Sequence, residues 1–227
     1  MQSVLIVGAG GLGVPAAIAL ARAGAISFAL LDADRVELSN LPRQVIFTEA
    51  DIGMPKASAA ARRLRQAYPG VAVRAVEDEL NLGNARRIIA EFAFVIDATD
   101  NPLAKFLIND TCVALGRPFV YAGVLGLTGQ VMTVIPGHSA CLRCLFEEPP
   151  DADEVTSCQQ AGILGPVAGA IGEIEAAEAL HVLRGEPPEL SGMMFTYNAA
   201  AAERIRLTPV SARTGCGCGA RSEPARA

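Results

Sequence analysis

The chain has 227 residues, of which 51% are hydrophobic and 19% charged, and its formal net charge is −5. This composition predicts a packed globular protein and argues against a disordered one. No run of Lys or Arg exceeds two residues, so nucleic acid and anionic membrane surfaces are not expected partners. The longest apolar stretch, 163–171, is interrupted by Gly and Pro and is shorter than the roughly 20 residues that span a bilayer. No secretory signal is apparent at the start of the sequence, so we expect a cytoplasmic protein.

The first half of the sequence alternates between predicted strands and predicted helices. Hydrophobic runs predict strands over 4–7, 26–31, 71–76, 94–96 and 119–122. Helical spacing of apolar residues predicts helices over 14–23, 54–68, 85–92 and 102–115. A strand followed by a helix and another strand is the unit of a parallel sheet, so we expect a Rossmann-like α/β fold, a mostly parallel sheet flanked by helices.

The alternation ends after about residue 125. A strand over 130–135, a helix over 166–183 and short strands over 193–197 and 204–207 are predicted, the last two as antiparallel additions to the sheet. An acidic, Pro-rich loop over 147–160 is expected to be mobile. The length fits one domain, so we expect a single Rossmann-like domain over 1–218 and a flexible tail over 219–227.

A glycine-rich turn separates the first predicted strand from the first predicted helix. Gly8, Gly10 and Gly13 form a G-x-G-x-x-G pattern that includes Gly11, and Asp32 ends the next strand 19 positions after Gly13. Glycines let the backbone approach phosphates, which interact with the N–H groups at the helix start, while the acidic residue accepts hydrogen bonds from ribose hydroxyls. The alternative is a tight packing turn with no ligand, in which case Asp32 would be coincidental.

Residues farther along favour ATP over NAD at this site. Arg43 and Lys56 bring two cations to the carboxyl edge of the predicted sheet, as a triphosphate requires. Asp100 follows the strand 94–96 and offers an oxygen ligand where a Mg²⁺ ion bridging phosphates would lie. Each charge alone would be interpreted as a solvated surface residue, but their combination at one edge predicts a nucleotide site.

The cysteines form two closely spaced pairs. Cys141 and Cys144 make a C-x-x-C pattern, and Cys216 and Cys218 a C-x-C pattern. Four thiolates suit a tetrahedral structural Zn²⁺ site that would fix the C-terminal segment to the sheet. A redox pair and a metal-free tail are the alternatives. His138 is more simply a loop histidine without a metal role.

Five segments resemble the MoeB/ThiF/HesA family, relatives of the ubiquitin-activating enzymes, in order and spacing. They are DADRVELSNLPRQ, GMPK, DATDN, CLRC and SCQQAG. The resemblance implies a zinc site at the four cysteines and Mg²⁺ at Asp100. It also implies ATP binding by the glycine turn and by Asp32, Asp34, Asn40, Arg43, Gln44, Lys56 and Asp100. Of these, Arg43, Lys56 and Asp100 would be catalytic.

The resemblance further implies a reaction and its partners. The C-terminal Gly-Gly carboxylate of a ubiquitin-like sulfur-carrier protein would attack the α-phosphate of ATP, in thiamine, molybdopterin or related biosynthesis. A carboxylate is already a nucleophile, so the site needs positioning and fixed charge rather than a general base. A sulfurtransferase or desulfurase partner would supply the sulfur. We also expect a homodimer through the small residues of the helix 166–183.

Cys158 occupies the position of the family's reactive cysteine and is the predicted nucleophile that would take the acyl group or join a persulfide relay. An incidental exposed thiol is the alternative, because some members of the family adenylate without this cysteine. Cys112, on an apolar helix, is expected in the core.

The sequence also departs from the family pattern. Members carry an N-terminal helical segment with an arginine that reaches the partner subunit's ATP site, whereas this sequence begins three residues before the first strand. Lys105 stands where the family often has arginine. The first departure motivates one alternative, a catalytically weak scaffold that binds nucleotide and carrier. The glycine turn alone also permits an NAD-dependent oxidoreductase, although no pair of residues suited to hydride transfer is evident.

Overall fold

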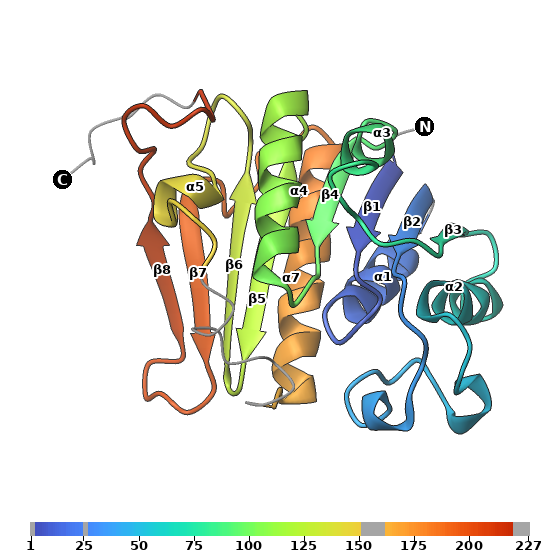
Figure 1. Ribbon diagram of the computed structural model, residues 1–227. Coiled ribbons are helices and arrows are strands. Elements are labelled where there is room, and N and C mark those ends of the chain that lie inside the picture. The colour runs from blue at the N-terminus through green and yellow to red at the C-terminus, as the bar shows by residue number, and fades with distance from the viewer. Residues whose placement is uncertain (1–2, 25–26, 151–161, 220–227) are drawn as a thin grey trace.

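The computed structural model describes residues 3–24, 27–150 and 162–219, which form one eight-stranded sheet with helices on both faces (Figure 1). The strand order is β3-β2-β1-β4-β5-β6-β7-β8. The first five strands are parallel, and β6, β7 and β8 are antiparallel. Their bounds are β1 Ser3–Val7, β2 Ser27–Leu31, β3 Ala72–Val76, β4 Phe94–Asp97, β5 Phe119–Leu125, β6 Thr128–Val134, β7 Met193–Asn198 and β8 Ile205–Pro209. The predicted Rossmann-like fold class, with antiparallel C-terminal strands, is confirmed.

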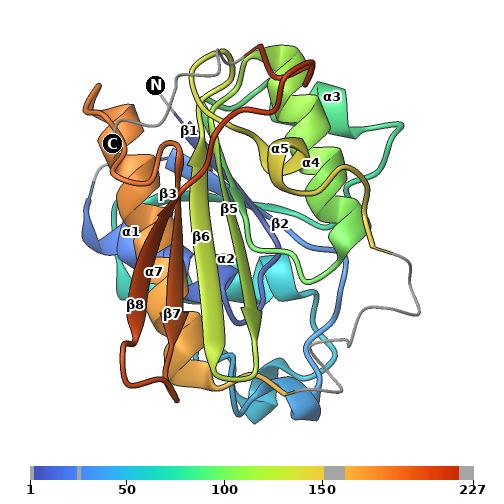
Figure 2. The same ribbon diagram turned by 90° about the vertical axis from the view of Figure 1, so that its left-hand side faces the viewer.

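The helices form two layers, one on each face of the sheet (Figure 2). One layer contains α1 (Gly13–Arg22), α2 (Lys56–Ala67) and α7 (Gly165–Leu183). The other contains α3 (Ala85–Ile89), α4 (Pro102–Leu115) and α5 (Leu142–Leu145). Successive residues of a strand point to opposite faces, so the buried central strands contribute to both cores. Ile6 and Phe94 pack in the α1/α7 layer, whereas Leu5 and Val95 pack in the α3/α4 layer.

The boundaries differ from the predictions at a few places. Helix α3 ends at Ile89 rather than at 92, and β5 continues to Leu125 because its antiparallel pairing with β6 extends beyond the end of β4. The short helix α5 and two single-turn 3₁₀ helices, η1 (Leu38–Asn40) and η2 (Glu49–Asp51), were not predicted. Each 3₁₀ turn is stabilised by a reciprocal capping box, a local polar interaction that hydrophobic spacing does not reveal.

Several expectations fall on residues outside the described part of the chain. Residues 151–161 hold Cys158 and most of the predicted loop 147–160, and residues 220–227 form most of the predicted tail. Among the described residues, no helix is both long and apolar enough to cross a membrane. Cys112 is fully buried, as expected.

A glycine of α7 brings this helix into close contact with α1. A Cβ atom on Gly172 would overlap the carbonyl oxygen of Leu12 and lie 3.1 Å from the amide nitrogen of Ala16. Gly169, one turn earlier, faces open space, since nothing lies within 4 Å of its Cβ position. Gly172 therefore serves packing within the chain, at the level where α1 begins.

Gly172→Ala should lower the free energy of unfolding by about 2 kcal/mol, because the added methyl meets backbone atoms that can move only if α1 and α7 separate. Gly169→Ala is the matched control on the same helix, and it should be neutral or stabilise by up to about 1 kcal/mol through helix propensity. Urea unfolding of the two variants measures both effects. Equal stabilities would show that α7 does not depend on this contact.

Candidate functional site

The turn between β1 and α1 is packed too tightly for side chains at two of its glycines. Gly8 has a φ angle of +100°, and a Cβ atom there would lie 2.7 Å from the carbonyl oxygen of Ala98. A Cβ atom on Gly13 would overlap the carbonyl oxygen of Gly8. At Gly10 and Gly11, by contrast, a Cβ atom would make only van der Waals contacts of normal length, with the side chains of Gln44 and Ala168. The turn thus presents bare backbone at the start of α1, the arrangement that lets phosphates approach amide N–H groups.

Asp32, at the carboxyl end of β2, links the glycine turn to the next segment. Its carboxylate accepts hydrogen bonds from the amides of Ala9, at 2.6 Å, and Asp34, at 2.8 Å. Burial raises the pKa of Asp32, and the two amide hydrogen bonds oppose this shift. The predicted ribose acceptor therefore lies beside the turn, with one oxygen already holding the backbone of the turn.

The segment after β2 brings two cations and two amides to the same edge. The Lys56 ammonium, at the start of α2, lies 2.7 Å from Asp34, whose side chain is 72% exposed. Arg43 donates to the carbonyl of Ser39 at 2.8 Å. Asn40 is buried, and its Oδ1 accepts from the Glu37 amide at 3.1 Å. Gln44 is buried beside Gly10, and its Oε1 has no hydrogen-bond partner among the described residues.

The chain turns sharply where β4 ends. Asp97 is fully buried, and its Oδ1 accepts from the Thr99 hydroxyl at 2.6 Å and the Thr99 amide at 3.2 Å. The next residue, Asp100, is exposed, and its side chain makes no hydrogen bond or ion pair with another described residue. Asn101 then caps α4 by accepting from the amide of Leu103. The turn therefore presents a single carboxylate beside the glycine turn.

A buried group of charges lies behind this turn. The Lys105 ammonium contacts Asp97 Oδ1 at 3.3 Å and the carbonyl oxygen of Ala122 at 2.5 Å. Glu175, on α7, is fully buried, and neither of its oxygens has a hydrogen-bond partner within the described part of the chain. Burial, and then the charge of Asp97, raise the pKa of Glu175 well above its usual range, which favours the neutral form of this carboxyl.

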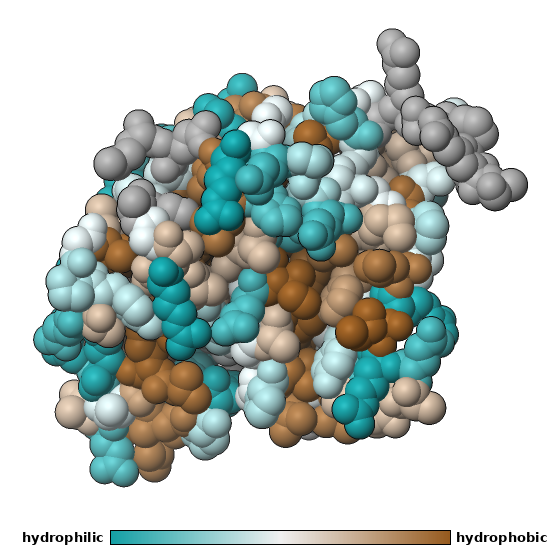
Figure 3. Space-filling model, turned by 180° about the vertical axis from the view of Figure 1, so that it is seen from behind, coloured by the Kyte–Doolittle hydropathy of each residue, from teal (hydrophilic) through white to brown (hydrophobic). Residues whose placement is uncertain are grey.

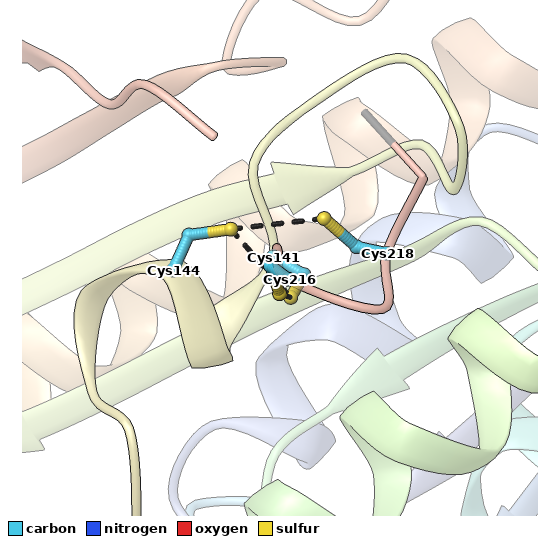
Figure 4. Close-up of side chains that lie close together, drawn as sticks. All are labelled: Cys141, Cys144, Cys216 and Cys218. Carbon is cyan, nitrogen blue, oxygen red and sulfur yellow. Dashed lines mark hydrogen bonds between the residues drawn. The ribbon is translucent and has the colours of Figure 1, made fainter. Parts of the chain in front are cut away.

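The four paired cysteines meet where the C-terminal segment passes the short helix α5 (Figure 4). Their sulfur atoms all lie within 4.8 Å of one another and could hold a metal ion. Three separations are 4.0 Å for Cys141 to Cys144, 3.6 Å for Cys141 to Cys216 and 3.7 Å for Cys144 to Cys218. A tetrahedral zinc site with Zn–S bonds of about 2.3 Å has sulfur atoms about 3.8 Å apart, so this spacing fits zinc. His138 is exposed and is not part of this cluster.

A groove of about 500 Å³ runs between α5 and the strands β7 and β8. Leu145 and Phe146 line its α5 side, while Thr196, Arg204 and Arg206 belong to the strand side. Phe146 is 48% exposed. The groove thus combines an apolar wall with two arginines on the C-terminal part of the sheet.

The structure brings most of the residues proposed from the sequence to two places. The glycine turn, Asp32, Asp34, Arg43, Gln44, Lys56 and Asp100 share the carboxyl edge of the parallel strands, and the four cysteines form one cluster. Asp97, Glu175 and the groove were not predicted. Two acids three positions apart at a strand end, and a Glu inside an apolar helix, were the available signals for Asp97 and Glu175.

Together, the strand order, the glycine turn and the acidic end of β2 define a Rossmann-like α/β protein, with the turn that is typical of nucleotide-binding members of this class. The chain belongs to the ThiF family, whose model matches residues 1–218.

The curated relatives include a sulfur carrier protein adenylyltransferase of Thermus thermophilus, 41% identical over 211 residues, which cover 91% of this chain and 78% of that protein. The adenylyltransferase and sulfurtransferase MOCS3 of Arabidopsis thaliana is 40% identical over 215 residues, which cover 94% of this chain and 46% of that protein. The chain thus spans about half the length of several relatives. Among solved structures, E. coli MccB with ATP has the same fold, with a TM-score of 0.84 at 22% identity, over 96% of this chain and 66% of that one.

Glu175→Gln should stabilise the protein at neutral and higher pH. Because the folded-state pKa of Glu175 is raised, the parent loses stability as the pH rises from the unfolded value of about 4.3 toward the folded value. The variant carries no ionisable group there, so its advantage should be small near pH 4 and grow as the pH rises toward 8. Thermal unfolding at several pH values measures this difference.

Glu178→Gln on the same helix is the control. Glu178 accepts hydrogen bonds from the amides of Glu189 and Leu190, both at 3.0 Å, so this variant should be destabilised instead. A Glu175→Gln variant with the same dependence on pH as the parent would contradict a neutral Glu175.

Proposed function

We propose that this protein adenylates the C-terminal Gly-Gly carboxylate of a ubiquitin-like sulfur-carrier protein, with ATP as the second substrate. The observation that carries the proposal is the glycine turn, where backbone without side chains lies beside Asp32, Lys56 and Asp100 at one sheet edge. Relatives that carry the name adenylyltransferase support it. Thiamine, molybdopterin or a related sulfur-containing product is the proposed destination, and the cytoplasm the proposed location.

The residues present fit ATP. Gly8 and Gly13 leave room for phosphates over the start of α1, and the unpartnered Oε1 of the buried Gln44 lies in the same neighbourhood. Among the described residues, Arg43 donates to a backbone carbonyl and the buried Lys56 pairs with the exposed carboxylate of Asp34, and both cations could turn from these partners to phosphate oxygens. We assign ribose binding to Asp32, and we place Asp34 and Asn40 in the same nucleotide site.

The proposed reaction is an in-line displacement. A carboxylate oxygen of the carrier forms a bond to the α-phosphorus, and the bond from that phosphorus to the bridging oxygen of pyrophosphate breaks. No proton moves, so the task of the protein is to align the two substrates and stabilise the charge that spreads over the phosphates. Asp100 would hold a Mg²⁺ ion, which neutralises phosphate charge when bound, and Arg43 and Lys56 would act directly on the phosphates.

The groove between α5 and the strands β7 and β8 is our proposed binding site for the carrier protein. The apolar wall at Leu145 and Phe146 suits an apolar patch on a small folded partner, and Arg204 and Arg206 suit acidic residues on it. We propose Cys158 as the residue that receives the activated acyl group or joins a persulfide relay. A separate sulfurtransferase or desulfurase would supply the sulfur.

We also propose a homodimer, for which the face of the sheet that carries α7 provides the surface. Phe195 pairs with Leu207, and Tyr197 pairs with Ile205, across β7 and β8. Ile205 and Leu207 are 55% and 54% exposed, and the view from behind shows apolar surface on this side (Figure 3).

Light scattering tests the homodimer. The measured mass should be twice the chain mass of 23.6 kDa, and Leu207→Asp should shift the measured mass toward that of the monomer, because it places a charge on the apolar surface.

The test of the proposed reaction is ATP–pyrophosphate exchange with Mg²⁺, measured with and without a carrier that ends in Gly-Gly. Exchange should require the carrier and should fall about 100-fold or more in Asp100→Ala. Glu91→Ala is the matched control, because it removes an exposed carboxylate that pairs with Arg74 elsewhere on the surface. Nucleotide binding without exchange under any condition would favour the scaffold function instead.

Zinc at the cysteine cluster is tested by metal analysis of the purified protein. We expect one zinc per chain, and a loss of binding in Cys216→Ser, which removes a ligand on the C-terminal segment. Cys112→Ser changes a cysteine outside the cluster and should retain the metal. A parent protein that holds no zinc after purification in zinc-containing medium would contradict the assignment.

A further inference from the structure

Beyond the end of β4, the side chains of Thr99 and Lys105 both bind the last residue of the strand, Asp97. The pairing of β4 and β5 ends at Asp97 with Tyr121, although β5 continues to Leu125. The next carbonyl of β5, that of Ala122, accepts from Lys105 at 2.5 Å instead of from a strand. The same ammonium lies 3.3 Å from Asp97. Lys105 therefore connects the buried carboxylate of Asp97 to the backbone of β5.

The fixed carboxylate in turn fixes Thr99. Both polar hydrogens of Thr99, on the hydroxyl and on the amide, are donated to Asp97 Oδ1, and the hydroxyl bond is the shorter at 2.6 Å. A hydrogen bond to a buried charged acceptor is stronger than one between neutral groups. The turn is therefore closed by two hydrogen bonds to an acceptor that is itself held by Lys105.

Asp100 lies between two anchored residues. Thr99 precedes it, and Asn101 follows it as the cap of α4 with a 2.9 Å bond from the amide of Leu103. Behind the turn, the carbonyl of Ala98 abuts Gly8, so the segment cannot shift toward the glycine turn. The exposed side chain of Asp100 thus projects from a backbone whose position is set on both sides.

We propose that Thr99 is a positioning residue, whose hydroxyl bond to Asp97 orients Asp100 toward the metal ion of the bound nucleotide. This inference rests on the proposed function, because it takes Asp100 as the metal ligand. Mg²⁺ demands near-ideal octahedral geometry, so a small rotation of its only proposed protein carboxylate weakens binding. Groups that orient metal ligands typically contribute 10- to 100-fold to metal affinity.

The experiment measures Mn²⁺ binding to the protein saturated with a non-hydrolysable ATP analogue, by the electron paramagnetic resonance signal of free Mn²⁺. Thr99→Val removes the hydroxyl and keeps the shape, and Thr99→Ser restores the hydroxyl. Thr111→Val is the matched control, the same change farther along α4. Affinity for the analogue in EDTA and the melting temperature are measured for every variant.

Thr99→Val should weaken Mn²⁺ binding about tenfold, with metal-free nucleotide affinity within about twofold of the parent. Thr99→Ser and Thr111→Val should bind Mn²⁺ as the parent does. If Thr99→Val does not fold, Thr99→Ala provides the same comparison.

Three results would overturn the inference in distinguishable ways. Parent-like Mn²⁺ affinity in Thr99→Val, together with weakened binding in Asp100→Ala, would show that Asp100 binds the metal without help from Thr99. Unchanged Mn²⁺ affinity in Asp100→Ala would remove the metal role of Asp100, and with it both this inference and that part of the proposed function. A parallel loss of metal-free nucleotide affinity in Thr99→Val would indicate a purely structural role.

Discussion

The contact between the glycine turn and the end of β4 sets the geometry of the carboxyl edge of the parallel strands, where we propose that the nucleotide binds. Gly8 lies so close to the carbonyl of Ala98 that no side chain fits between them, and Gly13 lies even closer to the carbonyl of Gly8. The consequence is that α1 begins directly over the end of the parallel strands. Gly172 makes a contact of the same kind between helices, because its missing side chain lets α7 pack against the start of α1. Three backbone contacts without side chains therefore hold β1, β4, α1 and α7 at one edge of the sheet.

The charges at this edge fall into two physical classes. The buried ammonium of Lys56 pairs with Asp34, a carboxylate that is 72% exposed, and Arg43 donates to a backbone carbonyl. Such cations can turn to an incoming polyanion. Lys105 instead binds two partners within the fold, the fully buried carboxylate of Asp97 and the carbonyl of Ala122, and so maintains the turn before Asp100. The edge thus combines movable cations with a rigid carboxylate.

The fold and the positions of most candidate site residues were predictable because each depends on a local signal. The glycine turn, Asp32 and Lys56 follow or begin elements that hydrophobic spacing reveals, and parallel strands place such residues at a common edge. Glu175 was missed because it occupies the buried face of an apolar helix, where sequence alone does not show which neighbours surround it. For the cysteines, the spacing within each pair suggested a metal site. Only the fold shows that Cys216 and Cys218 lie beside Cys141 and Cys144.

The central claim is that this edge directs a carboxylate onto the α-phosphorus of ATP, and an isotope measurement tests it most directly. A carrier whose C-terminal carboxylate is labelled with ¹⁸O is incubated with the protein, ATP and Mg²⁺, and the product is cleaved with hydroxylamine, which attacks the carbonyl carbon. Because the bridging oxygen comes from the carboxylate, the released AMP should carry one ¹⁸O atom. Label in inorganic phosphate, with ADP as the other product, would mean attack on the γ-phosphorus and would contradict the account.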